Sequence, residues 1–139
     1  MKKTLFTLLM FTISSVVFTG CKKDDDKKNG SIEGTWKSTK DVYYITVNGA
    51  KEGKDEVYNY SNSEYYLLTF SGNKYTNKEF EDGKITDTDE GTYTYSNGKV
   101  VFVGDYEARV EIKGNTLVLI SEEVENSRRY VLEEHFVRQ

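Results

Sequence analysis

Residues 92–103 read TYTYSNGKVVFV, and this stretch carries the pattern that decides the fold. Its first four residues alternate Thr with Tyr, which is the period of two that a half-buried β-strand requires. Asn97-Gly98 follows, and both residue types tolerate the positive φ of a tight hairpin turn. Lys99 to Val103 is a nearly continuous apolar run, typical of a strand that is covered on both faces. The stretch therefore predicts two antiparallel strands joined by a short turn.

The same pattern of strand and turn repeats along the chain. Further turn signals, in which Gly stands beside Asn or Asp, occur at residues 71–74, 81–84 and 113–116. The clearest alternation is Tyr106 to Ile112, whose apolar and charged residues point to opposite faces. No helix is expected. Strands are predicted at residues 33–39, 41–47, 64–70, 74–80, 84–95, 99–104, 106–113, 116–121 and 128–137.

Two features of this strand order stay open. Residues 41–47 form a strand of their own or continue the first strand through a bend, and residues 128–137 add a ninth element or pair with the first strand. Ala50–Ser63 is polar and is the longest break, so a mobile flap or loop is predicted there. The predicted fold class is all-β, an antiparallel up-and-down meander that removes its free edges by closing into a barrel.

Composition limits the classes of site that the chain can hold. With 139 residues it is long enough for one domain of ordinary size. Its only cysteine, Cys21, rules out an internal disulfide and a multi-cysteine zinc or iron–sulfur site. Its only histidine, His135, argues against a His-rich metal site. Without residues 1–20, 17 basic groups stand against 23 acidic ones, a net charge of −6, so no basic face for nucleic acid is expected.

The N-terminus has the organisation of a secretory signal peptide. Met1-Lys2-Lys3 is positively charged, and Thr4 to Phe18 is an uncharged apolar run. This run is short for a membrane-spanning helix, which needs about 20 apolar residues. Small residues follow at the expected cleavage position, just before Cys21. A signal peptide is therefore predicted over residues 1–20.

Phe18-Thr19-Gly20-Cys21 resembles the lipobox of bacterial lipoproteins, with Phe18 where Leu is more usual. The resemblance implies cleavage before Cys21 and lipid on its sulfur and its new amino group. Several acyl chains, at about 0.8 kcal/mol per buried methylene, would hold the protein firmly in a bilayer. The alternative is a free or buried thiol behind an ordinary signal peptide.

Residues 21–30 are predicted to be a flexible tether, because Lys22 to Asn29 contains no apolar residue. The Lys-Asp-Asp that follows soon after the cysteine resembles the surface-export signal of Bacteroidota lipoproteins, and a plain solvated linker is the alternative. The expected location is the outer membrane, reached through the lipid on Cys21, on its periplasmic face or on the cell surface.

Gly34-Thr35-Trp36 stands on the first strand, ahead of the meander, and matches the Gly-x-Trp motif of lipocalins. Together with the meander it resembles the lipocalin family and the lipocalin-like domains of Bacteroidota lipoproteins. The resemblance implies a small eight-stranded barrel with Trp36 plugging one end. It also implies a basic side chain across the Trp ring, for which Arg138, Arg129 and Arg128 are candidates and Arg138 is favoured by position. The domain is placed at residues 31–139.

Five aromatic residues are candidates for a ligand pocket, since each offers an apolar body and most add a hydroxyl: Tyr66, Phe70, Tyr93, Tyr95 and Tyr106. The alternative is that they fill the barrel. An eight-stranded barrel is just wide enough to be filled by side chains or to hold one small ligand. A mostly filled barrel with a shallow or small pocket is therefore expected.

Glu134 is a further pocket candidate. On a strand it shares a face with Leu132 and Phe136, so it points inward if they do. A carboxylate inside a barrel is costly unless it is paired, and it could bind the polar end of a ligand. The alternative is a wet position at the rim.

Other motifs carry little chemistry. Residues 87–91 resemble a fragment of a calcium loop, yet they lack a third ligand, so an acidic turn is expected and no metal site. No nucleophile–base pair and no phosphate loop appears, so no catalytic activity and no cofactor are expected. The leading hypothesis is a lipid-anchored protein that binds a small apolar or amphipathic ligand. The alternatives are a filled barrel that serves an envelope protein complex and an inhibitor that presents its loops to an enzyme.

Overall fold

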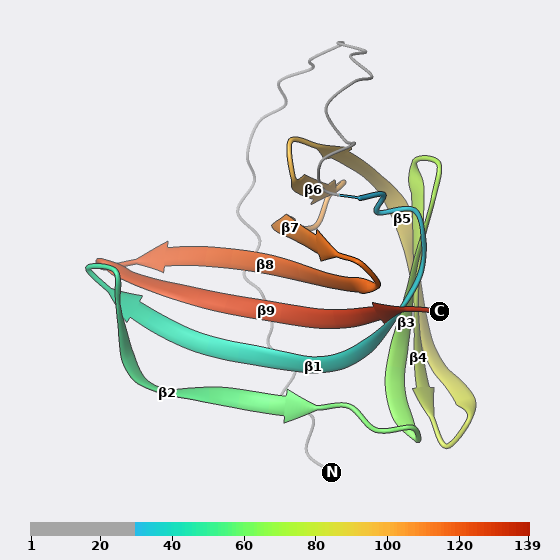
Figure 1. Cartoon of the computed structure of the whole chain (residues 1–139), viewed down its shortest axis with the longest axis horizontal. Coiled ribbons are helices and arrows are strands. Elements are labelled where there is room, and N and C mark those ends of the chain that lie inside the picture. Colours follow the sequence, from blue (N-terminus) through green and yellow to red (C-terminus); the bar gives the residue numbers. More distant parts are fainter. Residues whose placement is uncertain (1–29) are drawn as a thin grey trace.

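The computed structural model describes residues 30–139 (Figure 1). The predicted signal peptide, Cys21 and nearly all of the predicted tether lie outside these residues. The described chain forms nine antiparallel strands and no helix, so it contains no helix that could cross a membrane. The strands are β1 (Gly34–Val47), β2 (Ala50–Asn59), β3 (Glu64–Ser71), β4 (Lys74–Glu81), β5 (Lys84–Ser96), β6 (Lys99–Phe102), β7 (Glu107–Lys113), β8 (Thr116–Glu125) and β9 (Arg128–Arg138).

Eight of the strands close into a barrel. Strands β3 to β9 pair in sequence order, β1 pairs with β3, and β1 pairs again with β9 to complete the ring. The predicted fold class, an antiparallel up-and-down meander that closes into an eight-stranded barrel, is confirmed. The last predicted strand is the partner of the first, along the register Trp36↔Arg138 to Val47↔Arg128.

Strand β1 is continuous, so residues 33–39 and 41–47 are one bent strand. Its pairing with β9 shifts register between Ser38 and Lys40. Residues 34–37 pair with β3, whereas residues 40–47 pair with β2 along the same edge. Figure 1 shows the result, in which β8, β9, β1 and β2 lie side by side as a long sheet that extends away from β3, β4 and β5.

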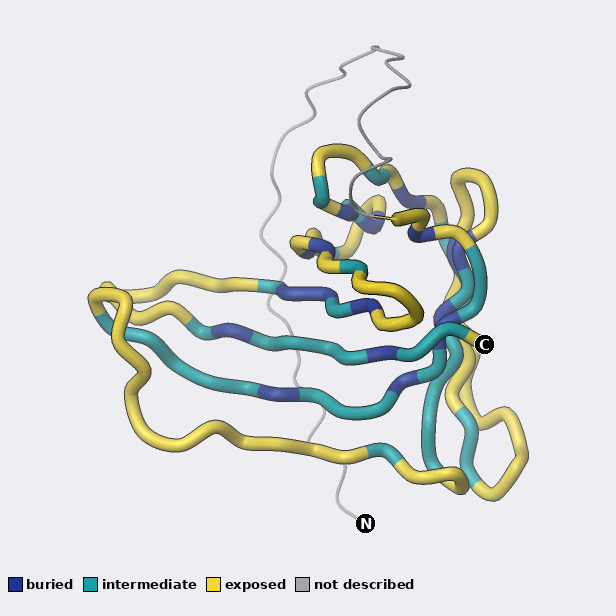
Figure 2. The backbone as a smooth tube through the Cα atoms, in the orientation of Figure 1, coloured by how far each residue is buried: buried dark blue, intermediate teal, exposed yellow. Residues whose placement is uncertain are grey.

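The predicted flap at Ala50–Ser63 is wrong for most of its length, because residues 50–59 form strand β2. Every residue of β2 is exposed (Figure 2), so the strand has no buried face to produce an apolar alternation. Its stability comes from backbone pairing with β1 instead. The signal that was missed is Asn48-Gly49, whose positive φ angles of 52° and 82° form the hairpin turn between β1 and β2.

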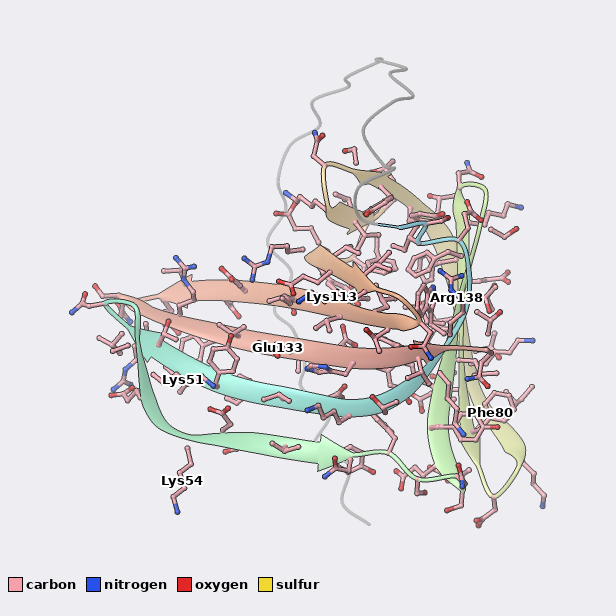
Figure 3. All side chains as sticks on the ribbon, in the orientation of Figure 1. Lys51, Lys54, Phe80, Lys113, Glu133 and Arg138 are labelled. Atoms are coloured by element: carbon pink, nitrogen blue, oxygen red, sulfur yellow. The ribbon has the colours of Figure 1, made fainter. Side chains whose placement is uncertain are left out.

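The barrel is packed shut at one end around Trp36, which is fully buried. Its indole N–H donates to the carbonyl of Ile32 at 2.8 Å. The Arg138 guanidinium lies 4.1 Å from the centre of the Trp ring and donates to the carbonyls of Glu33 (2.6 Å) and Ser31 (2.8 Å). Arg138 therefore holds the segment before β1 across the end of the barrel (Figure 3).

Gly34 is required by this arrangement on two grounds. Its φ is +116°, a backbone conformation that side chains with a Cβ rarely adopt. A Cβ at this position would also lie 2.7 Å from Nη1 of Arg138. The Gly of the Gly-x-Trp motif thus makes room for the arginine that covers the Trp.

Replacing Arg138 with Ala is expected to lower the free energy of unfolding by about 2 kcal/mol, because one cation–π contact and two charge-assisted hydrogen bonds are lost. Urea unfolding followed by Trp36 fluorescence measures this. Arg129→Ala is the matched control, since Arg129 only pairs with exposed Glu122 and such surface pairs contribute less than about 1 kcal/mol. Equal effects of the two substitutions would contradict the role given to Arg138.

Candidate functional site

The alternation of β9 places Glu134 inside the barrel. Phe136, two residues along on the same face, is buried in the core beside Trp36 and Leu117. Opposite Glu134 on the neighbouring strands stand Asp41 of β1 and Leu119 of β8, and Leu119 is also buried in the core. Glu134 therefore faces the interior from the middle of the sheet.

Two tyrosine hydroxyls bind the carboxylate of Glu134. Tyr66 of β3 donates to Oε1 at 3.1 Å, and Tyr106, directly before β7, donates to Oε2 at 3.3 Å. Burial raises the pKa of Glu134 from its ordinary value of 4.5 to about 7, and the negative charge of Asp41 acts in the same direction. The two hydroxyls oppose this rise because they stabilise the ionised form.

Asp41 brings a second carboxyl group to the same interior. It accepts a hydrogen bond of 2.6 Å from the hydroxyl of Tyr60, which lies between β2 and β3. Burial raises the pKa of Asp41. The Tyr60 ring packs edge to face on Tyr66, with 5.1 Å between ring centres, and Tyr66 packs in the same way on Phe136 at 5.4 Å. We call Asp41, Tyr60, Tyr66, Tyr106 and Glu134 the tyrosine–carboxylate cluster.

Strands β4 and β5 carry a further contact between a tyrosine hydroxyl and a carboxylate, and here the carboxylate is exposed. The hydroxyl of Tyr75 donates to Asp89 at 3.0 Å, and burial together with this bond raises the pKa of Tyr75 to about 12. Gly91 makes this possible, because a Cβ there would lie 2.8 Å from the Tyr75 ring. Asn77 stands opposite Asp89 in the sheet register.

Two acceptor atoms of this interior are buried and have no hydrogen-bond partner among the described residues: Oδ1 of Asp41 and Oδ1 of Asn77. Buried polar atoms in proteins are nearly always satisfied, and leaving one unsatisfied costs about 1–3 kcal/mol. The interior thus has hydrogen-bonding capacity that residues 30–139 do not use.

The outward face of β9 carries a second carboxylate, Glu133, in a different environment from that of Glu134. Glu133 accepts a hydrogen bond from the hydroxyl of Tyr44 at 3.0 Å, and its other oxygen lies 3.1 Å from Nε2 of His135 (Figure 3). Glu133 and His135 alternate with Glu134 along β9, so they lie on the outside of the barrel. Glu133 and Glu134 are neighbours in sequence in two contrasting environments.

The structure divides the predicted pocket residues into two regions. Tyr66, Tyr106 and Glu134 meet in the tyrosine–carboxylate cluster. Phe70 is only 1% exposed and packs into the core at the closed end. Tyr93 and Tyr95 lie near the closed end, where they line a cavity of about 450 Å³ together with Gly30, Ser31, Ile32, Glu33 and Gly72.

Sequence reasoning missed Asp41, Tyr60 and Asn77. Asp41 follows the register shift of β1, which reverses the face that each later residue presents, so simple alternation from Trp36 assigns it to the outside. Tyr60 fell within the segment predicted to be a flap. Asn77 lies in a strand that is mostly polar on both faces, so the sequence does not indicate whether its side chain points inward or outward. Within residues 30–139, no group of three or more His, Cys, Asp or Glu side chains converges as metal ligands do.

Glu134→Gln is expected to stabilise the domain at neutral pH and above. Because the folded state holds the Glu134 proton up to a pKa of about 7, this group's contribution to stability is present at pH 4 and is lost as pH rises from about 4.5 to 7. The loss is about 3 kcal/mol, and Gln removes it. Thermal unfolding between pH 4 and pH 8 measures the difference between variant and parent.

The matched control is Glu133→Gln, which removes the neighbouring charge on the outer face. It is expected to leave the fall in stability between pH 4.5 and 7 unchanged. A Glu134→Gln variant whose stability falls with pH as steeply as that of the parent would show that the interior carboxyl titrates normally.

One comparison with known proteins identifies the family. The family model described as a lipocalin-like domain matches residues 32–119, which is more than half of the chain. The comparisons with curated proteins and with solved structures gave no match. The match begins just before Trp36 and ends within β8, so it covers most of the meander and leaves out β9. The chain therefore belongs to the lipocalin-like domain family.

Proposed function

We propose that this protein is a lipid-anchored, non-catalytic envelope protein whose barrel holds one small amphipathic molecule. The observation that carries the proposal is Glu134, a carboxyl group inside the barrel bound by Tyr66 and Tyr106. A barrel that needed only to be filled would be more stable with apolar side chains there, because a buried carboxylate without a cation is costly. The polar interior is therefore best explained as the seat of a ligand's polar group.

The surroundings of the tyrosine–carboxylate cluster would suit the apolar part of the ligand. The side chains around the tyrosine–carboxylate cluster are apolar and buried: Leu68, Phe102, Leu119 and Phe136. The closed end around Trp36 and Phe70 is already packed. The space for a ligand is thus limited in depth, which favours a small molecule over a long lipid chain.

The anchoring part of the proposal rests on the N-terminal sequence, with its signal peptide pattern and Cys21 at the cleavage position. Gly30, the first described residue, packs beside Ile112, and the residues after it cross the closed end of the barrel. The segment that leads from Cys21 would therefore join the barrel at its closed end.

A second candidate function is supported by the long sheet beyond the barrel. The turns at residues 48–49 and 126–127 end two long hairpins, β1–β2 and β8–β9, that extend well past the other strands (Figure 1). Val124, near one of these turns, is 66% exposed, and Val57 of β2 is 52% exposed. Such an extended surface suits contact with a protein partner, including an enzyme that the protein would inhibit.

Native mass spectrometry after incubation with an envelope lipid extract tests ligand binding. The protein carries Cys21→Ser, so that lipid attached at that residue adds no mass. One discrete added mass is expected. Asn77→Phe, which fills the interior with a ring, should abolish it, whereas Lys78→Phe on the outer face of the same strand should not. A bare protein in every condition would contradict the ligand proposal and favour the second candidate.

Cys21→Ser itself tests the anchor. The parent protein is expected in the membrane fraction and the variant in the soluble fraction, because the acyl chains supply the attachment. Cell fractionation followed by immunoblotting measures the distribution. A variant that stays in the membrane fraction after a high-salt wash would contradict lipid attachment at Cys21.

A further inference from the structure

We propose that the bound molecule carries a protonated amine, and that this ammonium group sits in the barrel interior between Glu134 and Asp41. The inference rests on the proposed ligand-binding function and names the chemical class of the ligand's polar end.

The interior collects negative charge from separate strands. Glu134 comes from β9 and Asp41 from β1, and the two residues stand opposite each other in the sheet register. Their charges interact, since the pKa of Glu134 is raised first by burial and then by the negative charge of Asp41. Among the described residues, the hydrogen bonds to Glu134 and Asp41 come from tyrosine hydroxyls alone.

The basic side chains are engaged elsewhere. Lys37 lies over the outward ring of Tyr65, Lys99 pairs with exposed Glu107, and Arg129 pairs with exposed Glu122. Arg138 does face the interior, but it is used at the closed end on Trp36 and on two backbone carbonyls. A ligand with a carboxylate or phosphate would therefore meet acidic groups and no described basic partner inside the barrel.

The unsatisfied atoms give an independent indication. Oδ1 of Asp41 and Oδ1 of Asn77 are buried acceptors without a donor in residues 30–139. A ligand that satisfies them must donate hydrogen bonds. An ammonium group donates three and accepts none, so it meets both the charge and the hydrogen-bonding requirement of this interior.

The aromatic rings fit the same ligand. Tyr60, Tyr66 and Phe136 form a series of edge-to-face contacts beside the two carboxyl groups. Their faces can accept a cation, and this chain already places ammonium groups over tyrosine on its outer surface, with Lys37 and Lys51 each 4.1 Å from a ring centre. The hydroxyls of Tyr60 and Tyr66 keep their protons, because burial and the neighbouring carboxylates raise their pKa values.

Isothermal titration with three probes that share one apolar chain tests the inference: decylamine, decanol and decanoate, at pH 8 and below micelle-forming concentrations. The protein carries Cys21→Ser, so that it has no attached lipid. One decylammonium is expected to bind per chain, at least tenfold more tightly than decanol, and decanoate is expected to bind most weakly.

Substitutions then locate the ammonium group. Glu134→Gln and Asp41→Asn are each expected to weaken decylammonium binding at least tenfold, and to remove most of the preference for decylammonium over decanol. Both changes keep the shape of the side chain and remove its charge, and circular dichroism verifies that the barrel is intact. Glu133→Gln is the matched control on the outer face and should leave all three affinities unchanged.

Three results would overturn the inference. Equal binding of the three probes, abolished by Asn77→Phe, would mean that the barrel binds ligands but does not select a cation, so the proposed function would stand alone. A preference for decylammonium that survives both Glu134→Gln and Asp41→Asn would place the cation elsewhere. Binding of none of the probes, with a mass still acquired from the lipid extract, would reject the amine and keep the ligand-binding function.

Discussion

The contact between Arg138 and Trp36 is the constraint on which the rest of the barrel depends. It joins the last strand to the first, and its hydrogen bonds hold the segment before β1 over the end of the barrel. Because the two residues are also paired in the sheet register, the same contact fixes how β9 aligns with β1. That alignment places Asp41 opposite Glu134, so the closed end determines the geometry of the interior.

The two halves of the barrel follow different physical rules. The closed half is a packed apolar core in which Trp36, Phe70 and Leu117 leave little exposed surface. In the other half, hydroxyls and carboxyl groups alternate with apolar walls, and several acidic groups are shifted towards their neutral forms. Apolar packing at the closed end stabilises the fold, whereas the buried carboxyl groups in the other half destabilise it.

The sequence predicts the fold well where a strand has one buried face. Alternation, together with turns in which Gly stands beside Asn or Asp, locates the strands from residue 64 onward, and the Gly34-Thr35-Trp36 motif identifies the closed end. Prediction fails at β2, which is exposed on both faces and so has no apolar pattern. The site is predicted only in part: Glu134 follows from its apolar neighbours, whereas Asp41 depends on a register shift that appears only when β1 pairs with β9.

Strand β2 also shapes how this protein behaves among its own copies. In the described chain its backbone pairs only with β1, so its other backbone edge is available to a passing strand. Lys51 to Glu56 carries five charged residues around Gly53, whose φ of +79° interrupts the regular extended backbone. Charge and an irregular backbone are the features that keep open edges from joining into intermolecular sheets. The polar composition that removes the apolar pattern of β2 is therefore also what guards its open edge against pairing with another copy.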